Sequence, residues 1–238
     1  MKKTDQFFRF WVLNSLILIT SFTAFGQENI IKTGITGYLL GDFNLGYERM
    51  TVENQSVQFK MGYFSPVLSP IITGKTITPS EYTYLGSDGS VQMSLEYRFY
   101  TSKQGLKGFY LGPYFRYYGI RAEYTDIIQS KTFHVDGSVN SIGAGVQLGY
   151  QFIFNESFSL DISFFGAGID KNNVKLLYTT DTPNFNYNDI VDDVSEVFED
   201  VPYFEKRLEN EVNNDNLTSK LPFIFPGLRA SVSLGIAF

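Results

Sequence analysis

The last eleven residues, 228–238, alternate strictly between apolar side chains and small or polar ones. They read L-R-A-S-V-S-L-G-I-A-F, so Leu228, Val232 and Ile236 share one face, and Arg229 and Ser233 share the other. A period of two residues is typical of a β-strand with unlike faces. Seven earlier segments follow the same pattern, and the sequence therefore predicts an all-β protein. The eight alternating segments are 31–39, 43–51, 56–64, 91–100, 108–122, 138–154, 158–169 and 228–238.

The connections between these segments alternate in length. Short polar turns lie near Asn54, Gln104 and Glu156, and long connections span 65–90, 123–137 and 170–221. Only the first connection, near residue 41, departs from this order. Short turns on one side and long loops on the other are typical of outer-membrane barrels. We expect an eight-stranded antiparallel up-and-down transmembrane β-barrel, with both termini periplasmic and the long loops extracellular.

Alternation alone does not say which face lies inside, because a water-soluble barrel of the lipocalin type also alternates. The polar faces here are mostly small and neutral, whereas water would favour charged ones. Aromatic residues make up 17% of the chain, as expected for a barrel with aromatic girdles. Both observations favour the membrane barrel. Pro113 lies within one predicted strand, where it predicts a local bulge.

The first 26 residues resemble a secretory signal. Lys2, Lys3 and Arg9 give a basic start, and the apolar run that follows is shorter than the roughly 20 residues of a spanning helix. The segment closes on A-F-G, a small-x-small cleavage pattern. We expect residues 1–26 to be a cleaved signal peptide and residues 27–238 to form the barrel.

Composition excludes several function classes. The chain has no cysteine, which excludes disulfides, thiolate metal sites and a cysteine nucleophile. Its net charge of −6 argues against a nucleic-acid partner. We expect no cofactor, no metal site and a monomer whose main partner is membrane lipid.

Two motifs carry a resemblance to known proteins. The segments F-N-L-G-Y-E-R (43–49) and F-P-G-L-R-A-S-V-S-L-G (225–235) resemble a family of uncharacterised small outer-membrane barrels, and the whole pattern is similar to OmpA/OmpX-type barrels. The resemblance implies a bacterial outer-membrane location. It implies no catalytic residues.

Charged residues on the polar faces form a candidate lumen network. An eight-stranded barrel is just wide enough inside for side chains, so buried charges must pair there. We expect such pairing to plug the lumen; the alternative is a narrow ion channel. Glu48 and Lys60 lie equally far from the turn at Asn54 and are expected to face each other. The full candidate set is Glu48, Lys60, Glu96, Arg98, Arg116, Asp161 and Arg229.

Residues 170–221 form an acidic insertion before the last strand. Apolar residues at helical spacing predict one short amphipathic helix, and Phe204, Leu208 and Val212 predict a second after Pro202. The apolar stripe needs a partner, which is either the barrel's own mouth, closed by a lid above Arg229, or another protein. The expected apolar face of the first helix is Ile190, Val194, Val197, Phe198 and Val201.

His134 is the only histidine, and Ser138 lies four residues away. A base near a nucleophile leaves an outer-leaflet lipid-modifying enzyme as an alternative function. A lone His near a Ser is weak evidence in a Ser-rich chain, and we expect an ordinary loop histidine. The favoured function is a non-enzymatic barrel that acts through its outer loops in protein interaction, surface attachment or envelope integrity.

Overall fold

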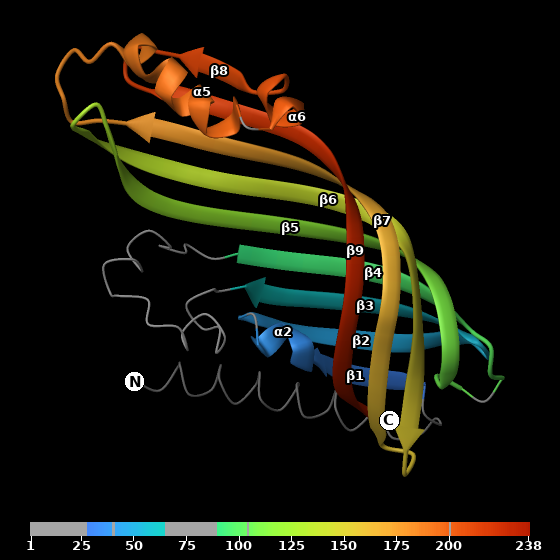
Figure 1. Cartoon of the computed structure of the whole chain (residues 1–238). Coiled ribbons are helices and arrows are strands. Elements are labelled where there is room, and N and C mark those ends of the chain that lie inside the picture. Colours follow the sequence, from blue (N-terminus) through green and yellow to red (C-terminus); the bar gives the residue numbers. More distant parts are fainter. Residues whose placement is uncertain (1–27, 40, 65–89, 104, 200) are drawn as a thin grey trace, which may run out of the picture.

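The computed structural model describes residues 28–39, 41–64, 90–103, 105–199 and 201–238 (Figure 1). The expected signal peptide, residues 1–26, lies outside the described part, as does almost all of the expected loop 65–90. The elements are β1 (Asn29–Gly34), α2 (Ile35–Leu39), β2 (Asp42–Val52), β3 (Gln55–Phe64), β4 (Ser90–Tyr100), β5 (Gly108–Ile128), β6 (Lys131–Phe154), β7 (Phe158–Thr179), η3 (Tyr187–Ile190), α5 (Val191–Glu199), α6 (Pro202–Glu205), β8 (Glu209–Val212) and β9 (Leu217–Ala237).

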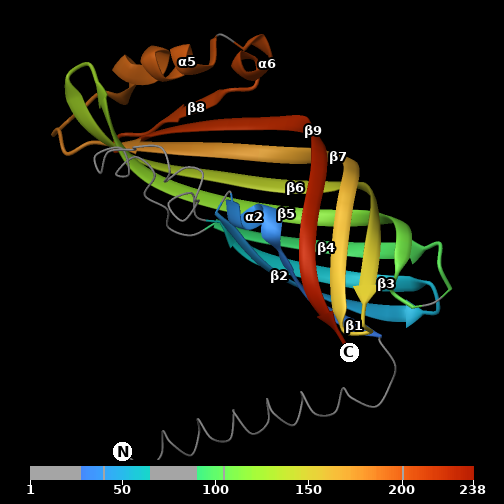
Figure 2. The same ribbon diagram turned by 60° about the horizontal axis from the view of Figure 1, so that its bottom comes forward.

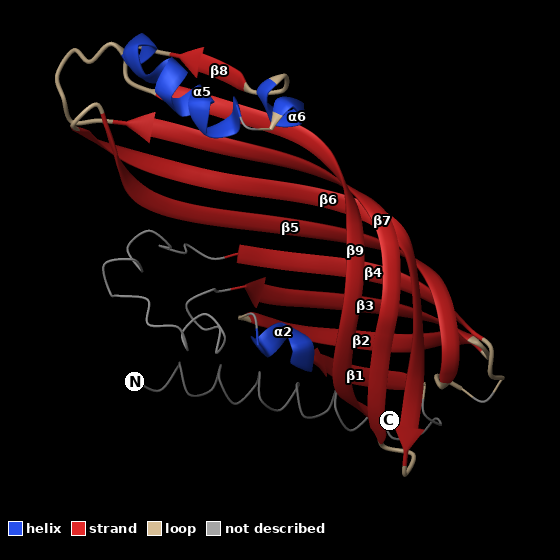
Figure 3. Cartoon of the chain, viewed as in Figure 1, coloured by secondary structure: helices blue, strands red, loops and turns tan. Residues whose placement is uncertain are grey.

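Nine strands of the described chain form one antiparallel sheet in the order β1-β2-β3-β4-β5-β6-β7-β9-β8. The sheet closes because β1 also pairs with β9, from Ile30↔Ala237 to Gly34↔Ser233. The colouring in Figure 3 shows that strands dominate and that helices are short and peripheral. The predicted all-β antiparallel fold is confirmed, with eight strands in the ring and β8 outside it. None of the described helices has the length and apolar character needed to cross a membrane.

The structure decides which face of each strand lies inside. In β4, Val91, Leu95 and Phe99 are exposed, whereas Glu96 and Arg98 are buried. The other ring strands follow the same rule, so the barrel has an apolar exterior and a polar interior. This orientation is opposite to that of a soluble lipocalin-like barrel.

Two of the predicted long loops are largely wrong. Strands β5 and β6 pair without interruption from Gly108↔Gln151 to Ile128↔Lys131, so only a tight turn at Gln129 and Ser130 remains of the loop 123–137. Strand β7 continues to Thr179, and β9 begins at Leu217, not at Leu228. These strands project beyond the ring as a curved sheet (Figure 2). The alternation continues there, but mostly charged or polar residues replace the apolar ones on the outer face. The contrast between an apolar and a polar face, which identified the ring strands, is therefore lost.

The first predicted strand is wrong after Gly34, where α2 replaces it. The Asn44 side chain accepts the Gly34 backbone N–H at 3.0 Å, in the place of a neighbouring strand's carbonyl. The chain then turns into the helix instead of extending the pairing between β1 and β9.

The predicted bulge at Pro113 is also wrong. Strands β4 and β5 keep one register from Glu96↔Tyr114 to Phe99↔Leu111, and only the pairs between them are missing. Proline has no N–H to donate, so the ladder is interrupted without a shift. The bulge lies in β7, where the register shifts around Phe164 and Phe165. The extra residue lets both rings face outward, each about half exposed.

Candidate functional site

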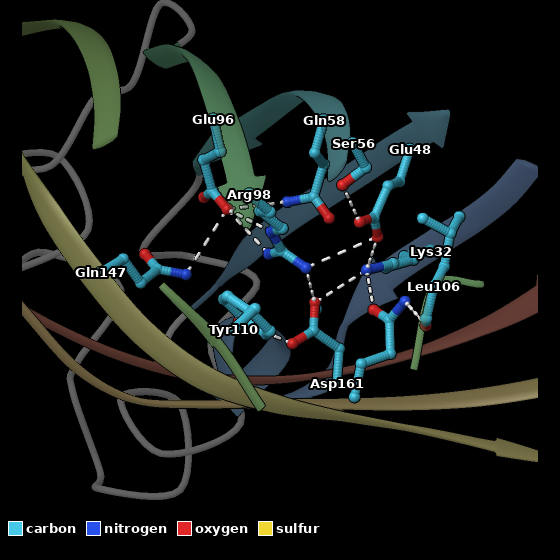
Figure 4. A network of polar contacts seen from close by, with 12 residues as sticks. Lys32, Glu48, Ser56, Gln58, Glu96, Arg98, Leu106, Tyr110, Gln147 and Asp161 are labelled. Atoms are coloured by element: carbon cyan, nitrogen blue, oxygen red, sulfur yellow. Dashed lines mark hydrogen bonds and ion pairs between the residues drawn. The ribbon is translucent and has the colours of Figure 1, made fainter. Parts of the chain in front are cut away.

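A polar network fills the lumen of the barrel near the end that carries the short turns (Figure 4). Lys32 on β1 forms ion pairs with Glu48 on β2 and with Asp161 on β7, the latter at 2.8 Å. Arg98 on β4 lies on the other side of Asp161, with Nη1 2.7 Å from Oδ2. Its Nη2 lies 2.7 Å from Glu96 Oε2. The network therefore joins strands from opposite sides of the ring.

Neutral groups complete the hydrogen bonding of these charges. Tyr100 donates to Glu48 at 2.6 Å, and Tyr110 donates to Asp161 at 2.8 Å. Gln151 accepts from Lys32 and donates to the Leu106 carbonyl at 2.6 Å. Buried ions keep their charge only when paired and hydrogen-bonded in this way. Removing one partner of such a pair typically costs about 3–5 kcal/mol.

Six of the seven sequence-predicted lumen residues take part in ion pairs. Glu48, Glu96, Arg98 and Asp161 belong to the central network, and Arg229 reaches it with Nη2 3.3 Å from Glu96. Arg116 instead pairs with Asp170 nearer the outer end, a partner that the sequence did not suggest.

Lys60 is the exception. The register places Glu48 opposite Gln58 and Lys60 opposite Gly46, so the expected pair of Glu48 and Lys60 is wrong by two residues. Glu48 pairs with Lys32 instead, which sequence reasoning missed. The sequence did contain a signal for Lys32, because Lys32 is the one charged residue in the predicted first strand, 31–39.

Within the acidic insertion, residues 187–212, from η3 to β8, form a cap on the projecting sheet. Ile190 and Val194 are buried, as predicted, against Phe133, Val135 and Leu217. The side chains of Val197 and Phe198 lie outside the described part, and Val201 is 42% exposed, so it is not buried with them. Because the cap packs on the extension of β6, β7 and β9, it is not a lid above Arg229. We call residues 120–138 and 171–221 the outer platform.

Only the first predicted helix of the insertion forms as expected. The second ends at Glu205, and residues 209–212 form β8, which pairs with β9 from Val212↔Leu217 to Glu209↔Lys220. Backbone pairing with the edge of β9 therefore makes residues 209–212 a strand, although the apolar residues of this segment have helical spacing.

Two further contacts hold the cap in place. Gln129, at the tip of the β5–β6 hairpin, donates to the Asp189 carbonyl at 2.9 Å and to Asp193 at 2.7 Å. Burial beneath the cap raises the pKa of Tyr178 well above its ordinary value. The cap is therefore packed onto the sheet.

The candidate catalytic pair does not form. His134 and Ser138 lie four residues apart on β6, which separates them by roughly 13 Å at the rise of a strand. His134 is exposed, and its Nε2 is 3.8 Å from a carboxylate oxygen of Asp181, which is exposed as well. The described residues contain no group of three or more His, Cys, Asp or Glu that could hold a metal ion.

Comparison with known proteins identifies a family. Residues 12–180 match the family described as "Protein of unknown function (DUF3575)". No curated protein matches the chain.

Two solved structures of bacterial proteins are similar to this chain in fold. The N-terminal β-barrel domain of Pseudomonas aeruginosa OprF is 12% identical, covers 90% of this chain and 100% of its own, and gives a TM-score of 0.29. A major outer membrane protein from Thermus thermophilus is 16% identical, covers 88% of this chain and 98% of its own, and gives a TM-score of 0.38.

Proposed function

We propose that this chain, which belongs to the family described as "Protein of unknown function (DUF3575)", is a non-conducting outer-membrane β-barrel that acts through its outer platform. The observation that carries the proposal is the combination of an apolar exterior with an interior filled by paired charges.

The apolar exterior forms a band of the height a membrane requires. On β4 the exposed apolar residues run from Val91 to Phe99, and on β9 from Ile224 to Ile236. The β4 stretch matches the roughly 9–11 residues of a transmembrane strand, and the β9 stretch is slightly longer. Beyond the band, the outer face of β7 carries Lys171, which is exposed. The change from apolar to charged residues marks where the membrane ends.

The position of Asn29 and Phe238 supports the proposed orientation. Asn29 and Phe238 exchange backbone hydrogen bonds at 3.1 and 2.9 Å, at the end of the barrel opposite the cap (Figure 1). In the proposed orientation this end is periplasmic and the outer platform is extracellular. Residues 1–26 are proposed to be the signal peptide that directs export.

The lumen is proposed not to conduct ions. Lys32, Glu48 and Arg98 are at most 1% exposed and meet across the interior. A porin needs a water-filled path, and side chains occupy that space here.

The outer platform is the part that can meet a partner. Its cap is packed on the projecting sheet by one face, and its other surface carries exposed acidic residues such as Asp192 and Glu196. Tyr203 of α6 is 40% exposed beside Val201. A partner with basic groups around an apolar patch fits this surface, so protein interaction is the role proposed for the platform.

Three measurements test the proposed function. The full chain should fractionate with outer membranes and show a heat-dependent gel shift. It should give no ion-selective openings in planar bilayers. A chain without the platform residues 187–212, joined by a short Gly-Ser linker, should stay folded in the membrane and lose the cross-linked partners of the intact protein. Recovery in the soluble periplasm or steady single-channel openings would refute the proposal.

A further inference from the structure

In the described part of the chain, the barrel wall is incomplete beside β9. Strand β1 covers β9 only from Ser233 to Ala237, and β8 covers it only from Leu217 to Lys220. Between these segments, no strand of the described chain pairs with this edge of β9. Figures 1 and 2 show β9 crossing in front of the other strands here, with α2 at the inner end of the opening.

At each end of this unpaired stretch of β9, a side chain hydrogen-bonds the backbone. At the outer end, the Tyr203 hydroxyl donates to the Ile224 carbonyl at 3.0 Å and lies 3.2 Å from the Ile224 amide nitrogen, which donates to it. At the inner end, the Val232 N–H donates to Thr36 Oγ1 of α2 at 3.3 Å. These groups take the place of a strand, and they leave this side of the backbone between Phe225 and Ser231 without a neighbouring strand among the described residues.

The prolines of β9 agree with an open edge. Ile224, Val232 and Phe238 all direct backbone groups to this side. Alternate residues of a strand direct their backbone groups to the same side, so Pro222 and Pro226 do so as well. Proline has no N–H and is tolerated where no neighbouring strand needs one.

A cavity of about 270 Å³ lies at this opening. Its lining includes the lumen cations Lys60, Arg116 and Arg229, and it reaches Leu228 and Ala230 on the open edge. The Leu228 side chain faces the membrane and is 76% exposed. The cavity therefore lies beside the open edge and touches both lumen-facing and membrane-facing residues of β9.

The cations of the cavity are not fully neutralised. The ammonium of Lys60 has no ion pair or hydrogen bond among the described residues. Arg229 pairs with Glu96 through Nη2, but its Nη1 is buried without an acceptor there. Arg116 is paired with Asp170. The carboxylate in the lining is Asp42, which already accepts from Gln92. An anion would satisfy the remaining charge.

We propose that this opening binds an anionic amphiphile, with its phosphate or carboxylate headgroup among Lys60, Arg116 and Arg229 and its acyl chain leaving beside Leu228 and Ala230. The headgroup oxygens would also accept the open N–H groups of the β9 edge. Unpaired backbone groups in hydrocarbon cost free energy, so the ligand completes the wall as well as neutralising the charge. This inference rests on the proposed membrane location of the barrel.

The test uses the full mature chain, refolded in a neutral maltoside detergent. Isothermal titration calorimetry compares dioleoylphosphatidic acid, dioleoylphosphatidylcholine and inorganic phosphate. We expect phosphatidic acid to bind with one site per barrel, at least about tenfold more tightly than phosphatidylcholine, because the latter has no net charge. Inorganic phosphate should bind at least about tenfold more weakly than phosphatidic acid, because it lacks the chain. Equal affinities for the two lipids, or for phosphate and phosphatidic acid, would overturn the proposal.

The variants locate the site. The double variant Lys60→Met with Arg229→Met should lose phosphatidic acid binding by at least about tenfold, whereas Lys175→Met, which removes an exposed cation on the platform, should leave it unchanged. Unchanged binding by the double variant would assign the lipid elsewhere and refute the site. If the double variant does not refold, Lys60→Met alone should weaken phosphatidic acid binding, and unchanged binding by it would refute the site. The comparison of probes on the unmodified chain is then read as above. A heat-dependent gel shift, measured first, tests the barrel itself, so failure of the lipid site is distinguished from failure of the proposed function.

Discussion

Arg98 joins three carboxylates of the lumen network, and replacing it with Met should destabilise the barrel strongly. Its guanidinium donates to Glu96 at 2.7 and 3.1 Å and to Asp161 at 2.7 Å. Methionine fills much of the volume but leaves these buried carboxylates with fewer donors. Breaking a buried pair typically costs about 3–5 kcal/mol, because an uncompensated charge remains.

The assay is urea unfolding of the barrel in detergent micelles, followed by the heat-dependent gel shift. With a slope of about 2 kcal/mol per molar urea, the midpoint should fall by about 1.5–2.5 M. The matched control is Lys175→Met, which lies exposed on the platform and should change the unfolding free energy by less than about 0.5 kcal/mol.

A double-variant cycle tests whether the network acts as a unit. Arg98→Met combined with Asp161→Asn should cost about 0.5–3 kcal/mol less than the sum of the single changes, because the two side chains share one ion pair. A cost below about 1 kcal/mol for Arg98→Met, as for an exposed pair, would refute the reasoning, and so would strict additivity.

Three further predictions concern the exterior, the cap and the open edge. Leu95→Lys, in the middle of the apolar band, should cost about 2–4 kcal/mol in lipid vesicles by urea titration, whereas Thr125→Lys on the platform should be neutral; equal effects would contradict the placement of the band. Ile190→Ala should cost about 2–5 kcal/mol of cap packing, seen as faster proteolysis within 187–212 with an unchanged gel shift; an unchanged cleavage rate would show that the cap is not held by this residue. Tyr203→Phe should speed hydrogen exchange at the Ile224 amide by removing its acceptor, and protection equal to wild type would refute the capping role of the hydroxyl.

The outer strand extensions show where sequence reasoning stopped. The alternation of β5 continues past Ala122, but from Arg121 to Thr125 its outer face carries polar or charged residues, and only Ile127 near the tip is apolar. A strand that lies outside the membrane has no lipid to face, so the signal that identified the barrel strands is absent. The two predicted loops are therefore mostly strand.

The lumen network shows a second limit. Alternation placed Glu48, Glu96, Arg98 and Asp161 inside correctly, because face is a local property of each strand. Pairing depends on register and on the tilt of strands around the ring, which are global. Lys32 therefore replaced Lys60 as the partner of Glu48.

The sequence by itself determined the class of fold, which residues share a face of each ring strand, and the presence of a helix in the acidic insertion. These follow from periodicity, which is encoded over a few residues. Only the tertiary structure decided the partners of the buried charges, the packing of the cap on the sheet and the open edge beside β9. Each of these depends on which distant segments meet when the ring closes, and closure through a short β1–β9 pairing is a property of the whole barrel.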